Sequence, residues 1–373
     1  MAMRNWQFEV FNPVIKVVSG WCNLRCDYCF YAGSQPIVET MSRQTLEAVM
    51  ERCLEVAPFV RFIWHGGEPT LTGVSFYEDV VSIGEALYSP GQRIRHSIQT
   101  NGTLITDEWA RFFKENGFGV GVSIDGPEKL HNLVRVDTAG GGSFVRVIRG
   151  INILRSNGAK VSAIAVVNNL TVNYPDEIFW FMYNMRLNFS INNCTAKPDD
   201  PFEVRNLAIS PMKYAQFLLA MLDLWLKLDD PSFMIRPLED IVKAVLGKQP
   251  RLCKYLGNCT RFLTIGHNGK VYPCDNFLTD EYCLGDLHKM SITDVLQGSQ
   301  SKAYYSGRQK MQAKCKQCGW YLICKGGCMR EWEGETYISN PVNHEFCQAR
   351  RYLFENASKI LSSLGYSTTV NVS

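Results

Sequence analysis

The sequence predicts an α/β protein in which a partial (β/α)6 barrel of the TIM type is followed by a cysteine-rich C-terminal domain. Short β-rich runs alternate with longer stretches of helical periodicity as far as residue 193, a pattern typical of repeated βα units around a parallel sheet. Of the 14 cysteines, three lie between residues 22 and 29, and eight more form spaced groups between residues 253 and 347. We therefore predict a barrel domain over residues 1–235 and a second domain over residues 236–373.

Six β-rich runs are expected to be the barrel strands: VIKVVS (14–19), VRFIWH (60–65), IRHSIQ (94–99), FGVGVSI (118–124), KVSAIAVV (160–167) and NFSINN (188–193). The helices are expected near residues 42–56, 74–87, 106–115, 143–156 and 175–184. Six strands are too few to close an eight-stranded barrel, so we expect an open one. Its chemistry should lie where the strands end, and five of the six runs are followed there by cysteine-bearing or polar loops.

The charge balance excludes some classes of partner. The 39 basic and 36 acidic residues leave a net charge of +3, without the basic excess that binding to nucleic acid or to a membrane surface requires. The first ten residues do not resemble a signal peptide, and the apolar run FLLAMLDLWLKL is short and contains Asp223 and Lys227. We expect a cytoplasmic protein with no nucleic-acid or membrane partner. Because the cytosol keeps thiols reduced, so many cysteines indicate metal binding.

The first cysteine group, in SGWCNLRCDYCFY (19–31), holds Cys22, Cys26 and Cys29 with no histidine nearby. An iron–sulfur cube has four irons, so three thiolates leave one iron with an open coordination position. A structural zinc site is instead closed by four ligands, and no further cysteine occurs before Cys53. The loop therefore predicts an iron–sulfur cluster that binds an additional ligand.

The CxxxCxxC spacing resembles that of the radical S-adenosylmethionine (SAM) superfamily. This resemblance implies that the open iron binds SAM and that electron transfer from the cluster produces a 5′-deoxyadenosyl radical. It also implies several cofactor contacts: Tyr28 beside the cluster, Gly66, Gly67 and Glu68 of GGEP, Asn101 of QTNG, Ser123 of SIDGP, and Arg135 as a carboxylate clamp. A solvated surface charge is the alternative interpretation of Arg135.

The second cysteine group reads C-x5-C-x14-C from Cys253 and C-x2-C-x5-C-x3-C-x18-C from Cys315. Eight thiolates are enough for two fully ligated iron–sulfur cubes or for two zinc sites. The pattern resembles the SPASM domain, which implies two auxiliary [4Fe-4S] clusters and three clusters in the whole chain. By that resemblance one cluster is held by Cys253, Cys259, Cys274 and Cys328, and the other by Cys315, Cys318, Cys324 and Cys347.

Among proteins with a SPASM domain, the chain resembles the anaerobic sulfatase-maturating enzymes in CNLRCDYCFY, GGEPTL, QTNGTLI, SIDGP, GKVYPCD, LGDL and CKGGC. This resemblance implies oxidation of a Cys or Ser side chain of a sulfatase to formylglycine, with Asp275 as the base that accepts the thiol or hydroxyl proton. The alternative is that Asp275 is a turn residue. Tyr31 and Cys194 are predicted substrate contacts, although Cys194 fits a buried structural thiol as well. The expected partners are a protein or peptide substrate and an electron donor such as flavodoxin or ferredoxin.

Two other functions stay open at the level of sequence. Enzymes that form cyclophane, thioether or other side-chain crosslinks in ribosomal peptides share most of these motifs, and the proline common before the first cysteine in sulfatase maturases is absent here. Many crosslinking enzymes carry an N-terminal leader-peptide-recognition domain, and the residues before Val14 are too few for one. This favours a globular protein substrate, or a peptide enzyme whose recognition module is separate or unnecessary. The other alternative is not an enzyme but a binding protein whose structure is stabilised by zinc bound to the same cysteines.

Overall fold

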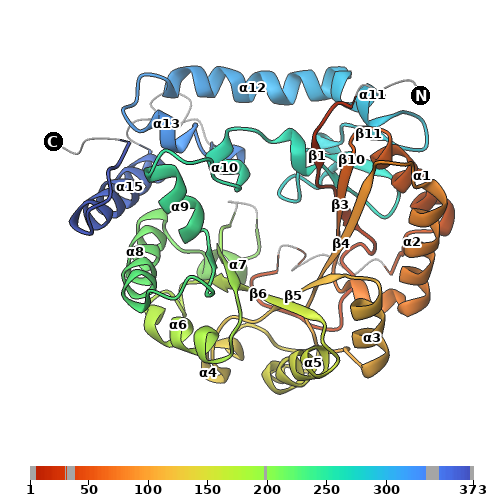
Figure 1. Ribbon diagram of the computed structural model, residues 1–373, viewed down its shortest axis with the longest axis horizontal. Coiled ribbons are helices and arrows are strands. Elements are labelled where there is room, and N and C mark those ends of the chain that lie inside the picture. The colour runs from red at the N-terminus through yellow and green to blue at the C-terminus, as the bar shows by residue number, and fades with distance from the viewer. Residues whose placement is uncertain (1–5, 30, 32–37, 197–199, 333–343, 370–373) are drawn as a thin grey trace.

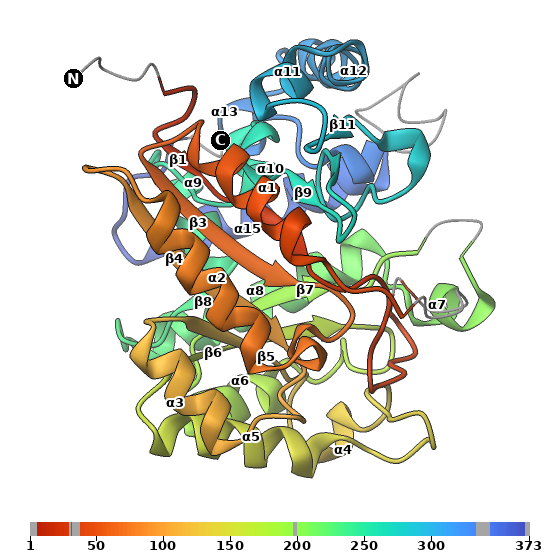
Figure 2. The same ribbon diagram turned by 90° about the vertical axis from the view of Figure 1, so that its right-hand side faces the viewer.

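The computed structural model describes residues 6–29, 31, 38–196, 200–332 and 344–369 (Figure 1). Within these ranges one mixed β-sheet curves through the molecule, and most of the helices lie around its outer face (Figure 1, Figure 2). The strand order is β11-β10-β9-β2-β3-β4-β5-β6-β7-β8, with β1 paired to β3. This open sheet of the described residues confirms the predicted partial barrel.

The six predicted strands form the parallel centre of the sheet. They are β2 (Val14–Lys16), β3 (Phe59–His65), β4 (Arg93–Thr100), β5 (Gly119–Ser123), β6 (Lys160–Val167) and β7 (Phe189–Asn193). Neighbours from β2 to β7 pair in parallel, so their carboxyl ends meet along one rim. β1 (Val10–Phe11) and β8 (Ile235–Arg236) were not predicted, because two residues are too few to show a periodicity.

The predicted helices are present as α1 (Arg43–Leu54), α2 (Val74–Leu87), α3 (Asp107–Glu115), α5 (Phe144–Ser156) and α6 (Pro175–Asn184). The apolar run FLLAMLDLWLKL belongs to α8 (Pro211–Leu228), which was not predicted; the Ser210 side chain caps it and Pro211 occupies its first turn. Shorter helices of this part are η1 (Pro69–Thr72), α4 (Glu128–His131), α7 (Phe202–Leu207) and α9 (Leu238–Val245). In the described part of the chain, no helix has both the length and the apolar character needed to cross a membrane.

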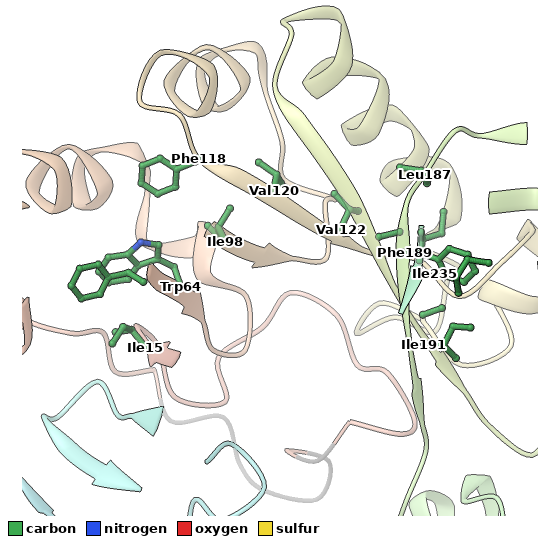
Figure 3. Close-up of a cluster of buried hydrophobic side chains, with 14 of the residues drawn as sticks. Ile15, Trp64, Ile98, Phe118, Val120, Val122, Leu187, Phe189, Ile191 and Ile235 are labelled. Carbon is green, nitrogen blue, oxygen red and sulfur yellow. The ribbon is translucent and has the colours of Figure 1, made fainter. Parts of the chain in front are cut away.

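The main core lies between the outer face of the sheet and the surrounding helices. Trp64, Ile98, Phe118 and Val122 are at most 1% exposed there, and Figure 3 shows their side chains gathered from neighbouring strands. Because side chains alternate along a strand, the residue after Trp64, which is His65, faces the inner side of the barrel. Packing of the core thus decides which strand residues can reach the site.

The C-terminal part adds strands to the same sheet. β9 (Thr264–Ile265) pairs in parallel with β2, and β10 (Lys270–Tyr272) and β11 (Gly285–Asp286) follow in antiparallel order. At the other edge, the predicted domain boundary falls within β8, and the division into 1–235 and 236–373 stays a prediction. The helices of this part are α10 (Cys253–Leu256), η2 (Thr260–Phe262), η3 (Asp280–Tyr282), α11 (Ile292–Gln297), α12 (Ser299–Cys315), α13 (Tyr321–Cys324), η4 (Met329–Trp332) and α15 (Glu345–Ser363), which packs along α8.

Gly150 in α5 lets this helix approach the loop after β4. A Cβ atom at residue 150 would lie 2.1 Å from the carbonyl oxygen of Gly102, which is far inside van der Waals contact. The same loop carries Asn101, so the close approach positions a predicted cofactor contact. Gly307 in α12 differs, because a Cβ atom there would meet no heavy atom within 4 Å.

The same substitution should therefore have opposite effects at these two glycines. Gly150→Ala should lower the free energy of unfolding by about 1–3 kcal/mol, the usual cost of overpacking, because α5 must move away from Gly102. Gly307→Ala should raise it by about 0.5–1 kcal/mol, because alanine is the better helix former. Urea unfolding of the reduced protein measures both changes. Effects of the same sign would contradict the steric role of Gly150.

Candidate active site

Three cysteines lie in the loop that follows β2, at the rim where the parallel strands end. Cys22, Cys26 and Cys29 are free and partly buried. Asn101 Nδ2 donates a hydrogen bond to Cys22 Sγ at 3.7 Å, and Arg135 Nη1 lies 3.9 Å from Cys26 Sγ. Hydrogen bonds to the sulfurs tune iron–sulfur clusters, so these surroundings suit the predicted group.

The donor set of the loop fits a polynuclear iron centre. Burial raises the pKa of Cys22 to about 12 and that of Cys26 to about 11, so the free thiols are protonated and metal binding must displace their protons. Within the described ranges, no three Cys, His, Asp or Glu side chains lie close enough to share one metal ion. A four-iron cube binds its thiolates at separate corners, and soft thiolates are its usual ligands.

The carboxylate of Asp125 ties the cysteine loop to the barrel. Its Oδ2 accepts hydrogen bonds from Tyr28 Oη at 2.6 Å and from Arg135 Nε at 2.8 Å, and its Oδ1 accepts one from the Val166 N–H at 2.8 Å. The Arg135 guanidinium also lies 5.4 Å from the centroid of the Tyr28 ring. The side chains of Arg135 and Asp125 are only 8% and 0% exposed. The alternative interpretation of Arg135 as a solvated surface charge was therefore wrong.

Glu68 of the GGEP motif is fully buried and joins the ends of β3 and β4. Its Oε1 accepts hydrogen bonds from the backbone and side chain of Thr70 and from Thr100 Oγ1, and its Oε2 accepts one from the Asn101 N–H at 2.7 Å. Burial raises the pKa of this carboxyl group, and the four hydrogen bonds oppose that rise. Glu68 thus has a structural role, and its contact with SAM stays a prediction.

The two glycines of this motif form a cradle without room for side chains. A Cβ atom at Gly67 would lie 2.1 Å from the Trp21 carbonyl oxygen, and one at Gly66, where φ is 149°, would lie 2.6 Å from the Val18 side chain. The Glu68 N–H donates to the same Trp21 carbonyl at 2.8 Å. The backbone of GGEP therefore packs directly against the start of the cysteine loop.

Two further predicted cofactor contacts lie at the same rim. Asn101 is 7% exposed and donates from Nδ2 to Asn23 Oδ1 at 2.8 Å, within the cysteine loop. Ser123 ends β5 and accepts a hydrogen bond from Gln99 Nε2 at 2.9 Å. The structure thus brings the ends of β3, β4 and β5 together around the three cysteines, while contact of these residues with SAM itself stays a prediction.

Asp275 reaches this rim from the C-terminal part. It lies in the turn after β10, and it is exposed. Burial raises the pKa of Tyr31, and the neighbouring charges of Cys29 and Asp275 raise it further. Burial also lowers the pKa of Lys16, an effect that Asp275 opposes more than any other group. Asp275 therefore occupies a turn, and its charge acts on Tyr31, the predicted substrate contact, and on Lys16 at the end of β2.

Lys16 and His65 form a buried polar pair that was not predicted. They are partners in the parallel register of β2 and β3, and Lys16 Nζ lies 3.4 Å from His65 Nδ1. Burial and the nearby Lys16 lower the pKa of His65 to about 3, so its imidazole is neutral at neutral pH. Nδ1 lies 2.8 Å from the Gly66 nitrogen and 3.2 Å from the Gly66 carbonyl oxygen. In the tautomer with the ring proton on Nε2, Nδ1 accepts from the Gly66 N–H and from Lys16. Lys16 and His65 are the last residues of two adjacent strands, β2 and β3. Two polar residues at these positions are the sequence signal that could have predicted the pair.

One auxiliary set of cysteines comes together near Asp275. Burial, and after it Cys259, raise the pKa of Cys253 to about 11. Burial also raises the pKa of Cys259, and the nearby Cys328 contributes to that rise. The pKa of Cys274 is raised well above its usual value by burial, then by Asp275 and by Cys328. These mutual effects show that the four predicted ligands of the first auxiliary cluster lie within electrostatic range of one another, and the cluster itself stays a prediction.

The second auxiliary set lies around the end of α12. The Cys318 N–H donates to the Cys315 carbonyl at 2.9 Å, and Arg350 Nη1 lies 3.5 Å from Cys324 Sγ. Cys347, near the start of α15, packs with Met311 and Met329. Burial raises the pKa of Cys328 in the first set, and Arg350 opposes that rise. Arg350 therefore lies between the two sets.

Cys194, the second predicted substrate contact, is 4% exposed. Its side chain packs with Val134 and Leu207, and Tyr28 lies against this cluster. Its backbone N–H donates to the Val167 carbonyl at 2.7 Å. Such burial favours the structural interpretation of this thiol, and its contact with a substrate stays a prediction.

The comparisons with known proteins agree with the geometry. The sequence pattern of the Radical SAM superfamily matches residues 17–181, and that of the SPASM iron–sulfur cluster-binding domain matches residues 253–319. A cysteine-type anaerobic sulfatase-maturating enzyme of Clostridium novyi is 33% identical over 93% of this chain and 95% of its own length. A serine-type anaerobic sulfatase-maturating enzyme of Bacteroides thetaiotaomicron is 30% identical over 92% of this chain and 89% of its own length.

Solved structures give the same result. The structure of native anSMEcpe with bound AdoMet and Cp18Cys peptide matches with a TM-score of 0.86 and 29% identity, over 96% of this chain and 99% of that one. Streptococcus suis SuiB bound to S-adenosylmethionine has a TM-score of 0.65 at 18% identity, over 89% and 76% of the two chains, which shows a shared fold. The predicted fold class and both predicted resemblances are confirmed.

The buried ion pair of this site gives a stability prediction. Asp125→Ala leaves the buried Arg135 charge without its partner, so the free energy of unfolding should fall by about 3–5 kcal/mol. Lys129→Ala is the matched control, because its ion pair with Glu177 is exposed and should contribute almost nothing. Urea unfolding of the reduced protein compares the two variants. Similar small losses in both would show that Asp125 does not hold the loop.

Proposed function

The chain belongs to the family of anaerobic sulfatase-maturating enzymes within the radical SAM superfamily, and on this premise we propose that it oxidises a Cys or Ser side chain of a sulfatase to formylglycine. The observation that carries the proposal is the place of Asp275. β10 joins β2 through β9, and the carboxylate in the turn after β10 acts electrostatically on Tyr31 and on Lys16 at the end of β2. Asp275 would thus be the general base near the predicted site of radical formation.

The residues present fit the cofactors that this family uses. Cys22, Cys26 and Cys29 would hold the [4Fe-4S] cluster with its open iron, and the glycine cradle of GGEP offers bare backbone beside it. When bound, cluster and SAM supply a 5′-deoxyadenosyl radical that removes a hydrogen atom from the substrate. The eight cysteines of the SPASM domain would hold two auxiliary clusters, so we propose three clusters in all.

The reaction balances with one base and one electron acceptor. After Cβ loses a hydrogen atom, the substrate loses one electron and one proton to form a C=O bond from serine or a C=S bond from cysteine. Water then replaces the sulfur of the thioaldehyde and releases hydrogen sulfide. Asp275 would accept the proton, and the auxiliary set that includes its neighbour Cys274 would accept the electron.

The chain's own residues prepare the site for this proton transfer. Lys16 is 3% exposed, and Asp275 opposes the lowering of its pKa by burial. In its protonated form, Lys16 would stabilise negative charge near the point where the substrate loses its proton. His65 is neutral, and in the tautomer with its ring proton on Nε2 it can donate a hydrogen bond but does not compete with Asp275 for the proton. The arrangement therefore has one proton acceptor and two groups that stabilise negative charge.

The partners would be a sulfatase chain in an unfolded or extended form and a one-electron carrier such as flavodoxin or ferredoxin. The native anSMEcpe structure contains a bound peptide, which supports a peptide segment as substrate here. The zinc-stapled binding protein has no support, because the matching C-terminal pattern is that of an iron–sulfur cluster-binding domain. A crosslinking enzyme would use the same clusters, so the product decides between these two chemistries.

The role of the first cysteine loop gives the next prediction. Replacing Cys22, Cys26 and Cys29 with Ala should leave roughly eight of about twelve irons bound but abolish cleavage of SAM, because the loop provides the open iron. Iron analysis and 5′-deoxyadenosine production measure the two effects. Cys283→Ala is the control and should retain both. Unchanged 5′-deoxyadenosine production in the triple variant would overturn the assignment.

The proposed role of Asp275 as the base can also be tested. Asp275→Asn removes proton affinity and keeps the shape, so formylglycine should fall about 10²- to 10⁴-fold while cleavage of SAM continues. Mass spectrometry of a sulfatase peptide with Cys or Ser at the target position measures the product, and it also reveals a crosslink if one forms. Asp280→Asn is the control, because Asp280 is an exposed acid in η3. Product yield close to the parent at full iron loading would remove Asp275 from the mechanism.

A further inference from the structure

The segment from Ser299 to Arg330 has an unusual charge. It contains seven basic residues and no acidic residue, whereas the whole chain has a net charge of +3, so the rest of the chain carries a net charge of −4. The segment covers α12, α13 and the connections after them. A local excess of this size attracts anionic partners even though the protein as a whole is almost neutral.

The structure separates one structural arginine from the exposed lysines of this segment. Arg308 is 4% exposed and donates to the carbonyl oxygens of Gly257 and Gly327. Lys310, Lys314 and Lys316, which we call the lysine patch, are exposed. Lys310 and Lys314 are four residues apart in α12 and so lie on the same helix face. α12 runs along the outside of the molecule, at the edge opposite α4 and α5 (Figure 1).

The lysine patch surrounds predicted cluster ligands. Cys315 lies between Lys314 and Lys316, and Cys318 follows two residues later. Leu322 in α13 is 68% exposed, an apolar residue beside this basic surface. Charged residues around a small apolar contact suit a transient complex, in which electrostatic attraction speeds encounter and the buried area stays small.

Another face of α12 is buried at Ser301, Arg308 and Met311. The Tyr304 ring packs edge-on against Phe277, with the ring centroids 5.5 Å apart, and the Phe277 N–H donates to the Cys274 carbonyl at 3.1 Å. Tyr304 thus lies at the first auxiliary set, whereas Lys314 lies ten residues later, about 15 Å along the helix. α12 therefore extends from the first auxiliary set, next to the proposed base, to the second auxiliary set. Cys315 of the second set is the last residue of the helix.

We propose that the lysine patch is the docking surface for an acidic one-electron carrier protein of the flavodoxin or ferredoxin class, which exchanges electrons through the second auxiliary set. This inference rests on the proposed function, because it needs redox-active groups at these cysteines. Each encounter moves one electron: a flavin hydroquinone becomes a semiquinone as the enzyme is reduced by one electron. The proposed peptide site at Asp275 lies elsewhere, so a peptide bound there would leave the exposed lysine patch accessible to a second partner.

The test compares two triple variants of the loaded enzyme. Lys310→Gln, Lys314→Gln and Lys316→Gln together remove three charges from the patch. The control removes three charges at Lys114, Lys160 and Lys227, exposed lysines where α3 and α8 end and β6 begins. These positions lie at the amino-terminal edge of the strands, away from the site.

Two measurements use an acidic flavodoxin as the probe. Binding of the oxidised flavodoxin at low ionic strength should weaken about tenfold in the patch variant and stay within twofold of the parent in the control. Reduced flavodoxin should drive cleavage of SAM about tenfold more slowly in the patch variant, and added salt should slow the parent towards the same rate. Dithionite should drive both variants as fast as the parent, because a small reductant needs no docking surface.

Two results would contradict the proposed docking surface. Equal affinity and equal flavodoxin-driven rates in patch and control variants overturn the docking surface. Loss of affinity for the sulfatase peptide instead of flavodoxin assigns the patch to the substrate and also overturns it. Failure of the proposed function is a different result, since the parent reduced with dithionite would then form no formylglycine in a sulfatase peptide.

Discussion

The site depends on one buried ionic interaction, between Asp125 and Arg135. An isolated carboxylate could not remain charged in this interior, and a guanidinium partner together with two further donors makes its burial tolerable. The same three donors come from the cysteine loop, from the segment after α4 and from β6. The interaction therefore fixes the three-cysteine loop on the barrel rim, where the other predicted cofactor residues gather.

The second determinant is the continuity of the sheet between the two parts of the chain. β9 pairs with β2, the strand that leads into the cysteine loop, and β10 leads into the turn of Asp275. Two strand pairings thus fix the distance between the predicted site of radical formation and the proposed base. Function here relies on backbone hydrogen bonds as much as on side-chain chemistry, because a catalytic base must be held within a narrow range of positions.

Charge is distributed unevenly over the rim and the outer surface. Inside, buried Lys16 lies near an acidic side chain and a neutral imidazole, an arrangement that stabilises negative charge without adding a second base. On the outer surface, the lysine patch makes the C-terminal part locally basic, although the net charge of the whole chain is only +3. The Lys16–His65 pair lies near the first auxiliary set of cysteines, and the lysine patch lies at the second. This separation suits a reaction in which the substrate's proton and electron go to different acceptors.

The sequence alone determined the strands β2 to β7 and five helices, because each contains enough residues to show its periodicity, and it determined the cysteine groups, because ligand spacing within a loop is local. Only the tertiary structure decided that Arg135 is buried and that β9 pairs with β2. It likewise decided that the Glu68 carboxylate accepts four hydrogen bonds from the protein. It also decided that Lys16 and His65 form a pair with Asp275 nearby. These facts depend on contacts between residues tens to hundreds of positions apart, which no local pattern of residue types encodes.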